Sequence, residues 1–285
     1  MIGMSIVSPL VYTGWRKSFT TGINQNQLIM IITFDNKIWS KSDLIKEMED
    51  DNFYYNYLGK NTLSSSIVTK LLESPRAYQM SLHPSSKSTS ALDFGWLFHT
   101  AILEPDVYED QVFLDVSSRN TKKFKDAKEE FGRVFTKSDR WKVERLSDAF
   151  YSNSNAVNLL SHSKQEVPAI GEIEGVPFRG KADILGDGYI ADIKTTTGIS
   201  GFRYSANKWN YDSQCYIYCQ LFNIDPENFW FIAIDKETYT VGIYNCSEEF
   251  YDRGKQKVLK AIDVYKKYFV DKTEEVGEFF IRETL

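Results

Sequence analysis

The sequence predicts a mixed α/β or α+β fold, with a small central sheet flanked by helices and a helical N-terminal part. Residues 61–160 place apolar side chains mainly at helical spacing, and residues 166–195 form three short runs with strand-like alternation. Residues 202–269 return to helices around two further strands. With 285 residues, of which 42% are hydrophobic and 26% charged, the chain is long enough to bury a sizeable core.

Helix and strand limits follow from caps, prolines and turn residues. Polar residues after Asn61 suit a helix N-cap, and Pro105 ends a helix because the residue before proline disfavours the helical region. The predicted helices cover residues 61–80, 90–103, 122–160, 202–222 and 247–269, and the predicted strands cover residues 166–171, 176–185, 189–195, 229–235 and 239–246.

Residues 1–60 show no sustained periodicity, because short apolar runs alternate with Gly, Ser, Thr and Asn. We interpret them as an N-terminal extension of unclear structure, and we place the main domain at residues 61–285.

The composition excludes several classes of protein. Seven Pro and sixteen Gly are too few for a low-complexity chain, and no run approaches the ~20 apolar residues that a membrane helix requires. The three cysteines, two of them four positions apart in one helical segment, suit a reducing compartment. The first ten residues lack the basic start and long apolar run of a secretory signal, so we expect a cytoplasmic protein.

The net charge of −5 provides no overall attraction to nucleic acid, so any DNA contact must be local. One basic concentration runs from Arg119 to Arg145, where ten Lys and Arg residues outnumber five acids. This stretch is equally consistent with a solvated helix face and with a DNA contact.

The most informative segment, residues 179–195, contains an Asp187-Gly188 pair between two strand-like runs. This pair is typical of a two-residue hairpin turn. Counting outward from that turn places Asp183 directly opposite Asp192, with their Cβ atoms ~5 Å apart.

Two opposed carboxylates in strands otherwise made of Ala, Ile and Leu destabilise one another. A divalent cation such as Mg²⁺ or Mn²⁺ would compensate, because these ions prefer hard oxygen ligands. Strand alternation also puts Lys194 on the same face as Asp192 and turns Ile193 into the core. The alternative is an exposed edge hairpin whose charges face water.

Other residues fit a site at this hairpin. Gln214 and Tyr218 are four positions apart in the following helix, so both project from one face toward the sheet. His99 lies in an apolar helical segment one turn after Gly95, where a small residue leaves room for close approach. Taken alone, Gln214 and Tyr218 more often occupy ordinary surface or core-edge positions, and for His99 by itself the core is favoured.

Taken in order, these segments resemble the PD-(D/E)XK nuclease superfamily, and within it the phage and prophage exodeoxyribonuclease VIII (RecE-like) group. The resemblance covers about residues 61–269. The matching motifs are Leu63-Ser64-Ser65-Ser66, Ser74-Pro75, Gly95-x-x-x-His99, Leu103-Glu104-Pro105, Glu166, Gly180-Lys181-Ala182-Asp183, Asp192-Ile193-Lys194-Thr195 and Gln214-x-x-x-Tyr218.

The resemblance implies a restriction-endonuclease-like core and specific roles for these residues. It assigns metal binding to His99, Asp183, Asp192 and the backbone carbonyl of Ile193. It makes Lys194 the catalytic lysine, Glu166 an accessory acid, and Gln214 and Tyr218 a supporting pair near the bound strand. Glu172 and Glu174 are rival accessory acids, and Ala182 stands where the superfamily name has Pro.

Four residues are expected to contact DNA: Ser64, Ser66, Arg179 and Lys181. The helix that begins at the serines presents free N–H groups and hydroxyls, which suit a terminal phosphate. Simple helix capping explains the serines equally well.

The resemblance further implies a Mg²⁺- or Mn²⁺-dependent exonuclease that degrades double-stranded DNA from its ends, 5′-to-3′, in phage-type recombination or DNA degradation. A ring-shaped homo-oligomer and a single-strand annealing protein are the expected partners, with no membrane contact. No iron–sulfur cluster is expected, because three cysteines cannot supply four ligands. The alternatives are a structure-specific endonuclease on the same core and a non-catalytic DNA-binding recombination protein.

Overall fold

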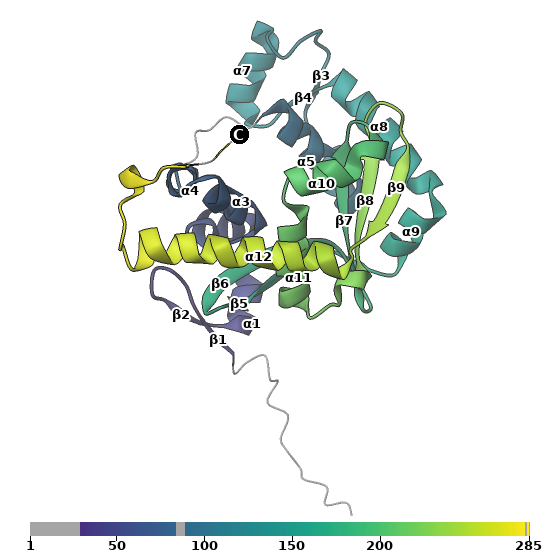
Figure 1. Ribbon diagram of the computed structural model, residues 1–285. Coiled ribbons are helices and arrows are strands. Elements are labelled where there is room, and N and C mark those ends of the chain that lie inside the picture. The colour runs from purple at the N-terminus through teal and green to yellow at the C-terminus, as the bar shows by residue number, and fades with distance from the viewer. Residues whose placement is uncertain (1–28, 84–88, 283, 285) are drawn as a thin grey trace, which may run out of the picture.

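A computed structural model describes residues 29–83, 89–282 and 284 (Figure 1). The first part of the N-terminal extension, residues 1–28, lies outside the described residues. The central sheet consists, in spatial order, of β5 (Lys164–Ile173), β6 (Val176–Gly186), β7 (Tyr189–Thr196), β8 (Phe229–Asp235) and β9 (Val241–Asn245). Within this five-stranded sheet the β7–β8 pair is parallel and the other three pairs are antiparallel. The predicted mixed α/β fold with a small central sheet is therefore confirmed.

The hairpin between β6 and β7 has the predicted register. Gly186 pairs with Tyr189 and Ile184 with Ala191, and the ladder stops there. Gly188 adopts a φ of 77°, which glycine tolerates in a two-residue turn. The next opposed positions are those of Asp183 and Asp192, so both carboxylates leave the hairpin where regular pairing ends.

Helices cover both faces of the sheet (Figure 1). The cluster on one face joins strand residues to α3 (Ser65–Glu73), α11 (Tyr211–Phe222) and α12 (Glu248–Tyr265). The cluster on the other face joins them to α5 (Ser90–Leu103), α8 (Lys137–Ser152) and α9 (Ser154–Ser161).

β6 changes face at Asp183. Ala182 packs in the cluster that contains α11, whereas Ile184 packs in the cluster that contains α5. Regular strand alternation would put these two residues on the same face. The irregularity places Asp183 where side chains from both helical layers can reach it.

Three long segments predicted as single helices are divided. Residues 61–80 begin at the last residue of α2 (Leu58–Asn61) and form α3 and α4 (Pro75–Ser81), which are separate because Ser74 is extended before proline and caps α4. Gly132, with a φ of 76°, ends α7 (Lys122–Phe131) and separates it from α8. Asn210, with a φ of 55°, separates α10 (Phe202–Lys208) from α11.

Shorter elements complete the structure. They are β1 (Met30–Ile32), β2 (Ile38–Ser40), α1 (Lys41–Glu47), a π-helix at Phe53–Tyr57, α6 (Pro105–Glu109), β3 (Phe113–Leu114), β4 (Phe135–Thr136) and a π-helix at Lys266–Val270.

Residues 29–60 pack against the outer strand of the sheet. Leu44, Met48, Tyr54 and Leu58 are buried in one cluster with Ile170 of β5. This packing joins residues 29–60 to the main domain. The predicted domain boundary at residue 60 stays a prediction.

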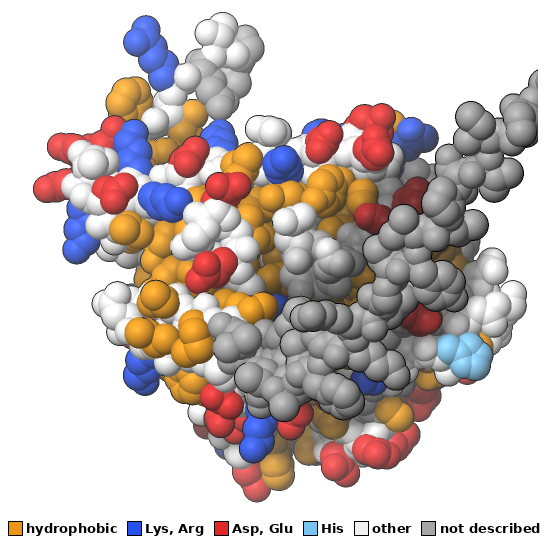
Figure 2. All heavy atoms as spheres, turned by 90° about the horizontal axis from the view of Figure 1, so that it is seen from below, with side chains coloured by type: hydrophobic (Ala, Val, Ile, Leu, Met, Phe, Trp, Pro, Cys, Tyr) orange, Lys and Arg blue, Asp and Glu red, His pale blue; other side chains and the backbone are white. Residues whose placement is uncertain are grey.

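The face in Figure 2 carries interspersed acidic and basic side chains around a hydrophobic stretch, and neither sign dominates what is drawn there. No helix in the described part of the chain has the length and apolar character needed to cross a membrane.

Candidate active site

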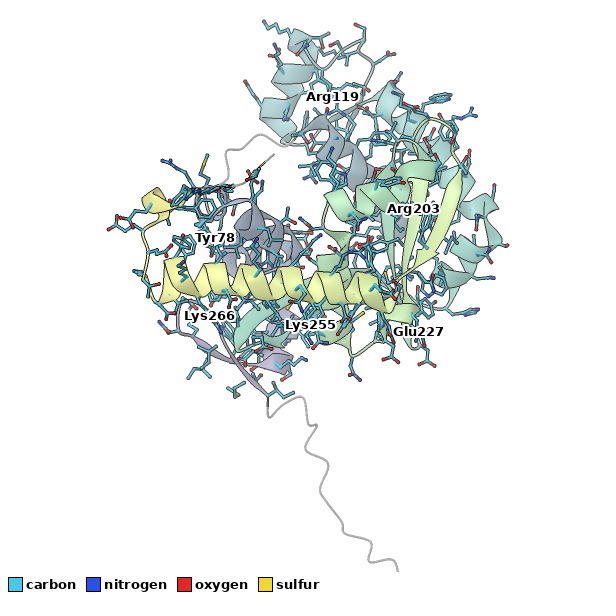
Figure 3. The ribbon with its side chains drawn as sticks, viewed as in Figure 1. Tyr78, Arg119, Arg203, Glu227, Lys255 and Lys266 are labelled. Carbon is cyan, nitrogen blue, oxygen red and sulfur yellow. The ribbon has the colours of Figure 1, made fainter. Side chains whose placement is uncertain are left out.

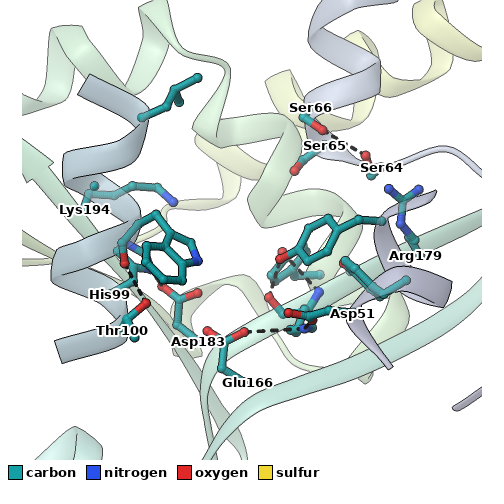
Figure 4. A pocket seen from close by; sticks show the side chains of 18 of the residues that line it. Asp51, Ser64, Ser65, Ser66, His99, Thr100, Glu166, Arg179, Asp183 and Lys194 are labelled. Carbon is teal, nitrogen blue, oxygen red and sulfur yellow. Dashed lines mark hydrogen bonds and ion pairs between the residues drawn. The ribbon is translucent and has the colours of Figure 1, made fainter. Parts of the chain in front are cut away.

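An open cleft of about 500 Å³ lies between the start of α3, the middle of α5 and the strands β5, β6 and β7 (Figure 4). It brings together residues that are far apart in the sequence. Of the predicted site residues, those that line it are Ser64, Ser66, His99, Glu166, Arg179, Lys181, Asp183, Lys194 and Tyr218. Asp192, Ile193 and Gln214 are not among the lining residues.

Three carboxylates form a row across three strands beneath this cleft. The β5–β6 pairing places Glu166 opposite Asp183, and the hairpin register places Asp183 opposite Asp192. Glu166 has a φ of 50°, unusual for a non-glycine residue, and it is skipped in the ladder. Such outliers collect at functional sites.

The row concentrates negative charge in a buried place. Burial raises the pKa of Glu166 to about 8, with repulsion from Asp183 adding to the effect. Burial, together with repulsion from Asp192, raises the pKa of Asp183 to about 6. A cation would therefore bind favourably near these groups, because its charge offsets both the burial of the carboxylates and their mutual repulsion.

Glu172 and Glu174, the rival accessory acids, lie near the turn between β5 and β6, at the end of β5 away from Glu166. Glu172 pairs with Pro177, six positions along β5 from Glu166, which corresponds to about 20 Å. Only Glu166 of the three lines the cleft. Its role as accessory acid stays a prediction.

His99 approaches the hairpin from α5, as predicted. Its Nδ1 lies 3.3 Å from Oδ2 of Asp183, and the same oxygen accepts a 2.8 Å hydrogen bond from the backbone N–H of Ile193. Gly95 has nothing within 4 Å of the place of a Cβ, and it lines the cleft. The small residue therefore leaves room in the cleft itself, and it is not required for packing.

Asp192 is held from two sides. The ammonium of Lys194 forms an ion pair with its Oδ2, and Nε2 of Gln214 donates a 2.5 Å hydrogen bond to its Oδ1. Burial disfavours the charge on Lys194, but Asp192 and Asp183 outweigh it and raise the pKa of this lysine. The ring of Tyr211 lies 5.0 Å from the same ammonium. Lys194 is therefore a fixed cation beside the two acids.

Tyr218 supports the strand that carries Asp183. Its hydroxyl donates a 3.0 Å hydrogen bond to the carbonyl of Lys181. A Cβ at Gly180 would lie 2.8 Å from the ring of Tyr218, so only glycine allows this close approach. Gln214 and Tyr218 thus both reach the sheet from α11, as their spacing predicts.

Gln214→Glu is expected to reduce activity about tenfold or more, because it adds a further carboxylate directly against Asp192 and removes the amide donor. Gln214→Asn keeps the donor type on a shorter side chain and serves as the conservative comparison. The readout is the Mg²⁺ concentration needed for half-maximal rate, which should rise if Gln214 positions Asp192. Equal loss in both variants without that shift would indicate a purely structural role.

The opposite wall of the cleft carries hydroxyl and basic groups (Figure 4). Ser64 precedes α3 but makes no side-chain capping hydrogen bond, and its Oγ lies 3.1 Å from Oγ of Ser66. Capping by Ser64 is therefore not what this structure shows. The N-terminal end of α3 stays available to an anion.

Arg179 and Lys181 are largely occupied by internal contacts. Nη1 of the buried Arg179 donates 3.0 Å hydrogen bonds to the carbonyl of Leu58 and to Oγ1 of Thr62. Nζ of Lys181 lies 2.9 Å from Oδ1 of Asp51. Their predicted contact with DNA stays untested, and both line the cleft.

The N-terminal part supplies cleft residues that sequence reasoning missed. Asp51, Tyr54 and Tyr55 line the wall beside Lys181. Tyr55 is 56% exposed, although it belongs to an aromatic run. The available signal was that aromatic run next to an acid, in a region without recognisable periodicity.

The donor set fits a weakly coordinated divalent ion. Among the described residues, no three His, Cys, Asp or Glu side chains are grouped so that they could hold a metal by themselves. Mg²⁺ is usually bound by one or two carboxylates together with substrate phosphates and water, and does not need an all-protein cage. The pair Asp183 and Asp192 meets that requirement, with His99 and the backbone of Ile193 adjacent.

Comparisons with known proteins agree with this geometry. Residues 64–276 match the PDDEXK-like domain of unknown function (DUF3799). A structure named "Putative exonuclease" from Eubacterium rectale is 14% identical, with a TM-score of 0.59, over 83% of this chain and 95% of that chain. A phage related exonuclease from Haemophilus somnus 129PT is 16% identical over 76% of this chain and 98% of that chain, with a TM-score of 0.33.

None of the curated proteins matches the chain. At this identity the structural likeness to the Eubacterium rectale protein shows the fold alone. The predicted resemblance to PD-(D/E)XK nucleases is confirmed, because the matched segment covers most of the chain, including all three strands of the acidic row. The chain belongs to the PDDEXK-like domain family of unknown function (DUF3799).

Proposed function

We propose that this protein is a metal-dependent nuclease that hydrolyses phosphodiester bonds of double-stranded DNA from an end, in the 5′-to-3′ direction. The observation that carries the proposal is the row of Glu166, Asp183 and Asp192 with Lys194 fixed beside it in an open cleft. Nucleases with this fold generally use divalent metal ions.

Asp183 and Asp192 would hold Mg²⁺ or Mn²⁺, with His99 and the carbonyl of Ile193 as further ligands. When bound, the ion would polarise the scissile phosphate and lower the pKa of a water molecule. Lys194 orients the attacking water and stabilises charge that develops on the phosphate, because Asp192 fixes its ammonium at the edge of the cleft. Gln214 acts through Asp192, and Tyr218 acts through the strand that carries Asp183.

The start of α3 favours action at a DNA end. Ser64 and Ser66 at this helix start line the cleft on the wall opposite His99 and Lys194 (Figure 4). A helix N-terminus attracts a phosphate. A terminal 5′-phosphate bound there would set the distance from the end to the acids.

The same proposal includes a cytoplasmic setting in phage-type recombination or DNA degradation. A ring-shaped homo-oligomer that encloses the product strand and a single-strand annealing protein are its expected partners. Analytical ultracentrifugation with and without DNA ends measures the oligomeric state.

The deciding experiment is digestion of end-labelled linear duplex and closed circular duplex, each with Mg²⁺ and with EDTA. We expect nucleotides to be released from the linear DNA only, with Mg²⁺ only, and faster from a 5′-phosphate end than from a 5′-hydroxyl end. Cutting of the closed circle would instead favour the endonuclease. Binding without cleavage of either DNA would favour the non-catalytic DNA-binding protein.

A further inference from the structure

A second hollow, of about 490 Å³, lies beside the cleft at the N-terminal end of α5. Its charged lining residues are Asp93, Arg119, Lys125, Lys128 and Arg133, and we refer to this place as the basic hollow. Four cations thus surround one acid. Arg119 lies next to α7 in Figure 3, and α7 carries Lys125 and Lys128 of the basic hollow.

The cations of the basic hollow keep most of their donors available. Oxygens of the buried Asp93 lie 3.9 Å from nitrogens of both Arg119 and Arg133, which is too long for a hydrogen bond. Asp93 therefore attracts the two guanidinium groups without occupying their N–H groups, whereas Nη2 of Arg119 donates a 2.9 Å hydrogen bond to Oδ2 of Asp139. Across residues 29–83 and 89–282, Lys125 and Lys128 form no ion pair or hydrogen bond through their side chains.

Two members of the basic stretch outside the hollow, Arg140 and Lys137, are paired with acids. Arg140 lies 2.8 Å from Glu144 and 3.6 Å from Glu109, and Lys137 lies 3.0 Å from Asp115. The stretch from Arg119 to Arg145, which the sequence left undecided, thus contains cations paired with acids, among them Arg119, Lys137 and Arg140, and lysines without such a pair, of which Lys125 and Lys128 line the basic hollow.

The basic hollow continues the catalytic cleft. Trp96 of α5 lines the cleft, and the guanidinium of Arg133 lies 4.0 Å from the centre of its ring. Asp93 precedes His99 by six positions on α5, which corresponds to about 9 Å along the helix axis. A phosphate chain that passes the acids can therefore reach the cations one or two turns further along the same helix.

The acidic cleft itself offers few free cations to DNA phosphates, so a cationic surface outside the cleft is needed for binding. Glu104, Glu166 and Asp183 line the cleft, and its lysines Lys181 and Lys194 are paired with acids. The chain as a whole carries a net charge of −5. Affinity for DNA comes mainly from cations that contact backbone phosphates, so these cations must lie outside the acidic row.

We propose that the basic hollow binds the phosphate backbone of duplex DNA next to the position of cleavage. This inference rests on the proposed nuclease function. Lysine and arginine side chains around a hollow contact phosphates and do not read base edges, so the binding is independent of sequence. The affinity it supplies does not require the metal, because none of its residues belongs to the acidic row.

The test compares two double variants of one helix. Lys125→Ala/Lys128→Ala removes two cations of the basic hollow, and Lys122→Ala/Lys123→Ala removes two exposed cations of α7 that do not line it. Both variants change the net charge by the same amount. The affinity for a blunt duplex of arbitrary sequence is measured from low to moderate salt, in EDTA and again in Ca²⁺.

We expect Lys125→Ala/Lys128→Ala to weaken binding about tenfold near 0.1 M salt and to reduce the slope of log K against log salt by about 1.8. The control pair should change the slope by less than about 0.5, and the cleavage rate of both variants at saturating DNA should stay near that of the parent. Equal changes of the salt slope in the two pairs would overturn the proposal and leave a solvated helix face. Thermal unfolding of each variant shows whether the fold is retained.

The outcomes separate this inference from the nuclease proposal. If the protein binds DNA with the expected difference between the two pairs but never cleaves it, the proposal for the basic hollow stands and the nuclease proposal is wrong. If the protein cleaves DNA and the two pairs change the salt slope equally, only the proposal for the basic hollow is wrong. A protein that does not bind duplex DNA at all contradicts both.

Discussion

Asp183→Asn is expected to lower Mg²⁺-dependent cleavage by about a thousandfold or more, because it removes a carboxylate from the proposed metal-binding pair and with it several kcal/mol of charge stabilisation. The fold should persist, since an Asn oxygen can still accept the hydrogen bond from the N–H of Ile193. The measurement is single-turnover cleavage of a labelled duplex. Retained Mg²⁺-dependent activity in both Asp183→Asn and Asp192→Asn would disprove the assignment of the site.

The same variant should make the metal-free protein more stable, with a specific dependence on pH. Burial and Asp192 raise the pKa of Asp183 to about 6 in the folded protein, above its value of ~3.9 in the unfolded chain. The folded state therefore binds more protons, and this carboxyl lowers stability progressively as the pH rises from ~4 to about 6. The increase in the free energy of unfolding caused by Asp183→Asn should reach its full size above pH ~7 and be small near pH ~4.

Calorimetric melting in EDTA at several pH values measures this gain. Asp192→Asn is the contrasting variant, because it leaves the buried Lys194 without its counter-charge. It should lose activity without becoming more stable. A gain from Asp183→Asn that does not vary with pH would show that relief of the carboxylate pair is not its cause.

Lys194→Ala is expected to lower kcat by roughly a hundredfold or more, because the lost ammonium stabilises charge that is largest in the transition state. Affinity for DNA should change little, since one cation contributes only about one unit to the salt slope. Single-turnover cleavage in Mg²⁺ measures the first quantity, and binding of a duplex end in Ca²⁺ measures the second.

Lys181→Ala provides the matched control for Lys194→Ala. Both lysines line the cleft, but Lys181 is paired with Asp51 on the opposite wall, away from Asp192. Its removal should affect affinity more than kcat. If Lys194→Ala instead binds much more weakly and cuts at a near-normal rate once saturated, Lys194 is a phosphate anchor and its catalytic role is wrong.

Local rules were sufficient for the hairpin, for α5 and for β8. The Asp187-Gly188 turn determines the register of two strands, and that register alone opposes Asp183 to Asp192. Pro105 ends α5 at the predicted residue. Spacing along a helix also predicted that Gln214 and Tyr218 reach the sheet together, because side chains four residues apart share one face.

Only the tertiary structure decided what depends on contacts between distant segments. It placed Glu166 in the cleft and Glu172 and Glu174 outside it, since Glu166 lies near the start of β5 whereas Glu172 and Glu174 lie at its other end and in the turn that follows. It brought Asp51 and Tyr55 to the wall of the cleft from a region without periodicity. It also decided which cations of the basic stretch pair with acids and which line a hollow, because the neighbours of a lysine on a helix surface come from other elements and are not encoded in its own spacing.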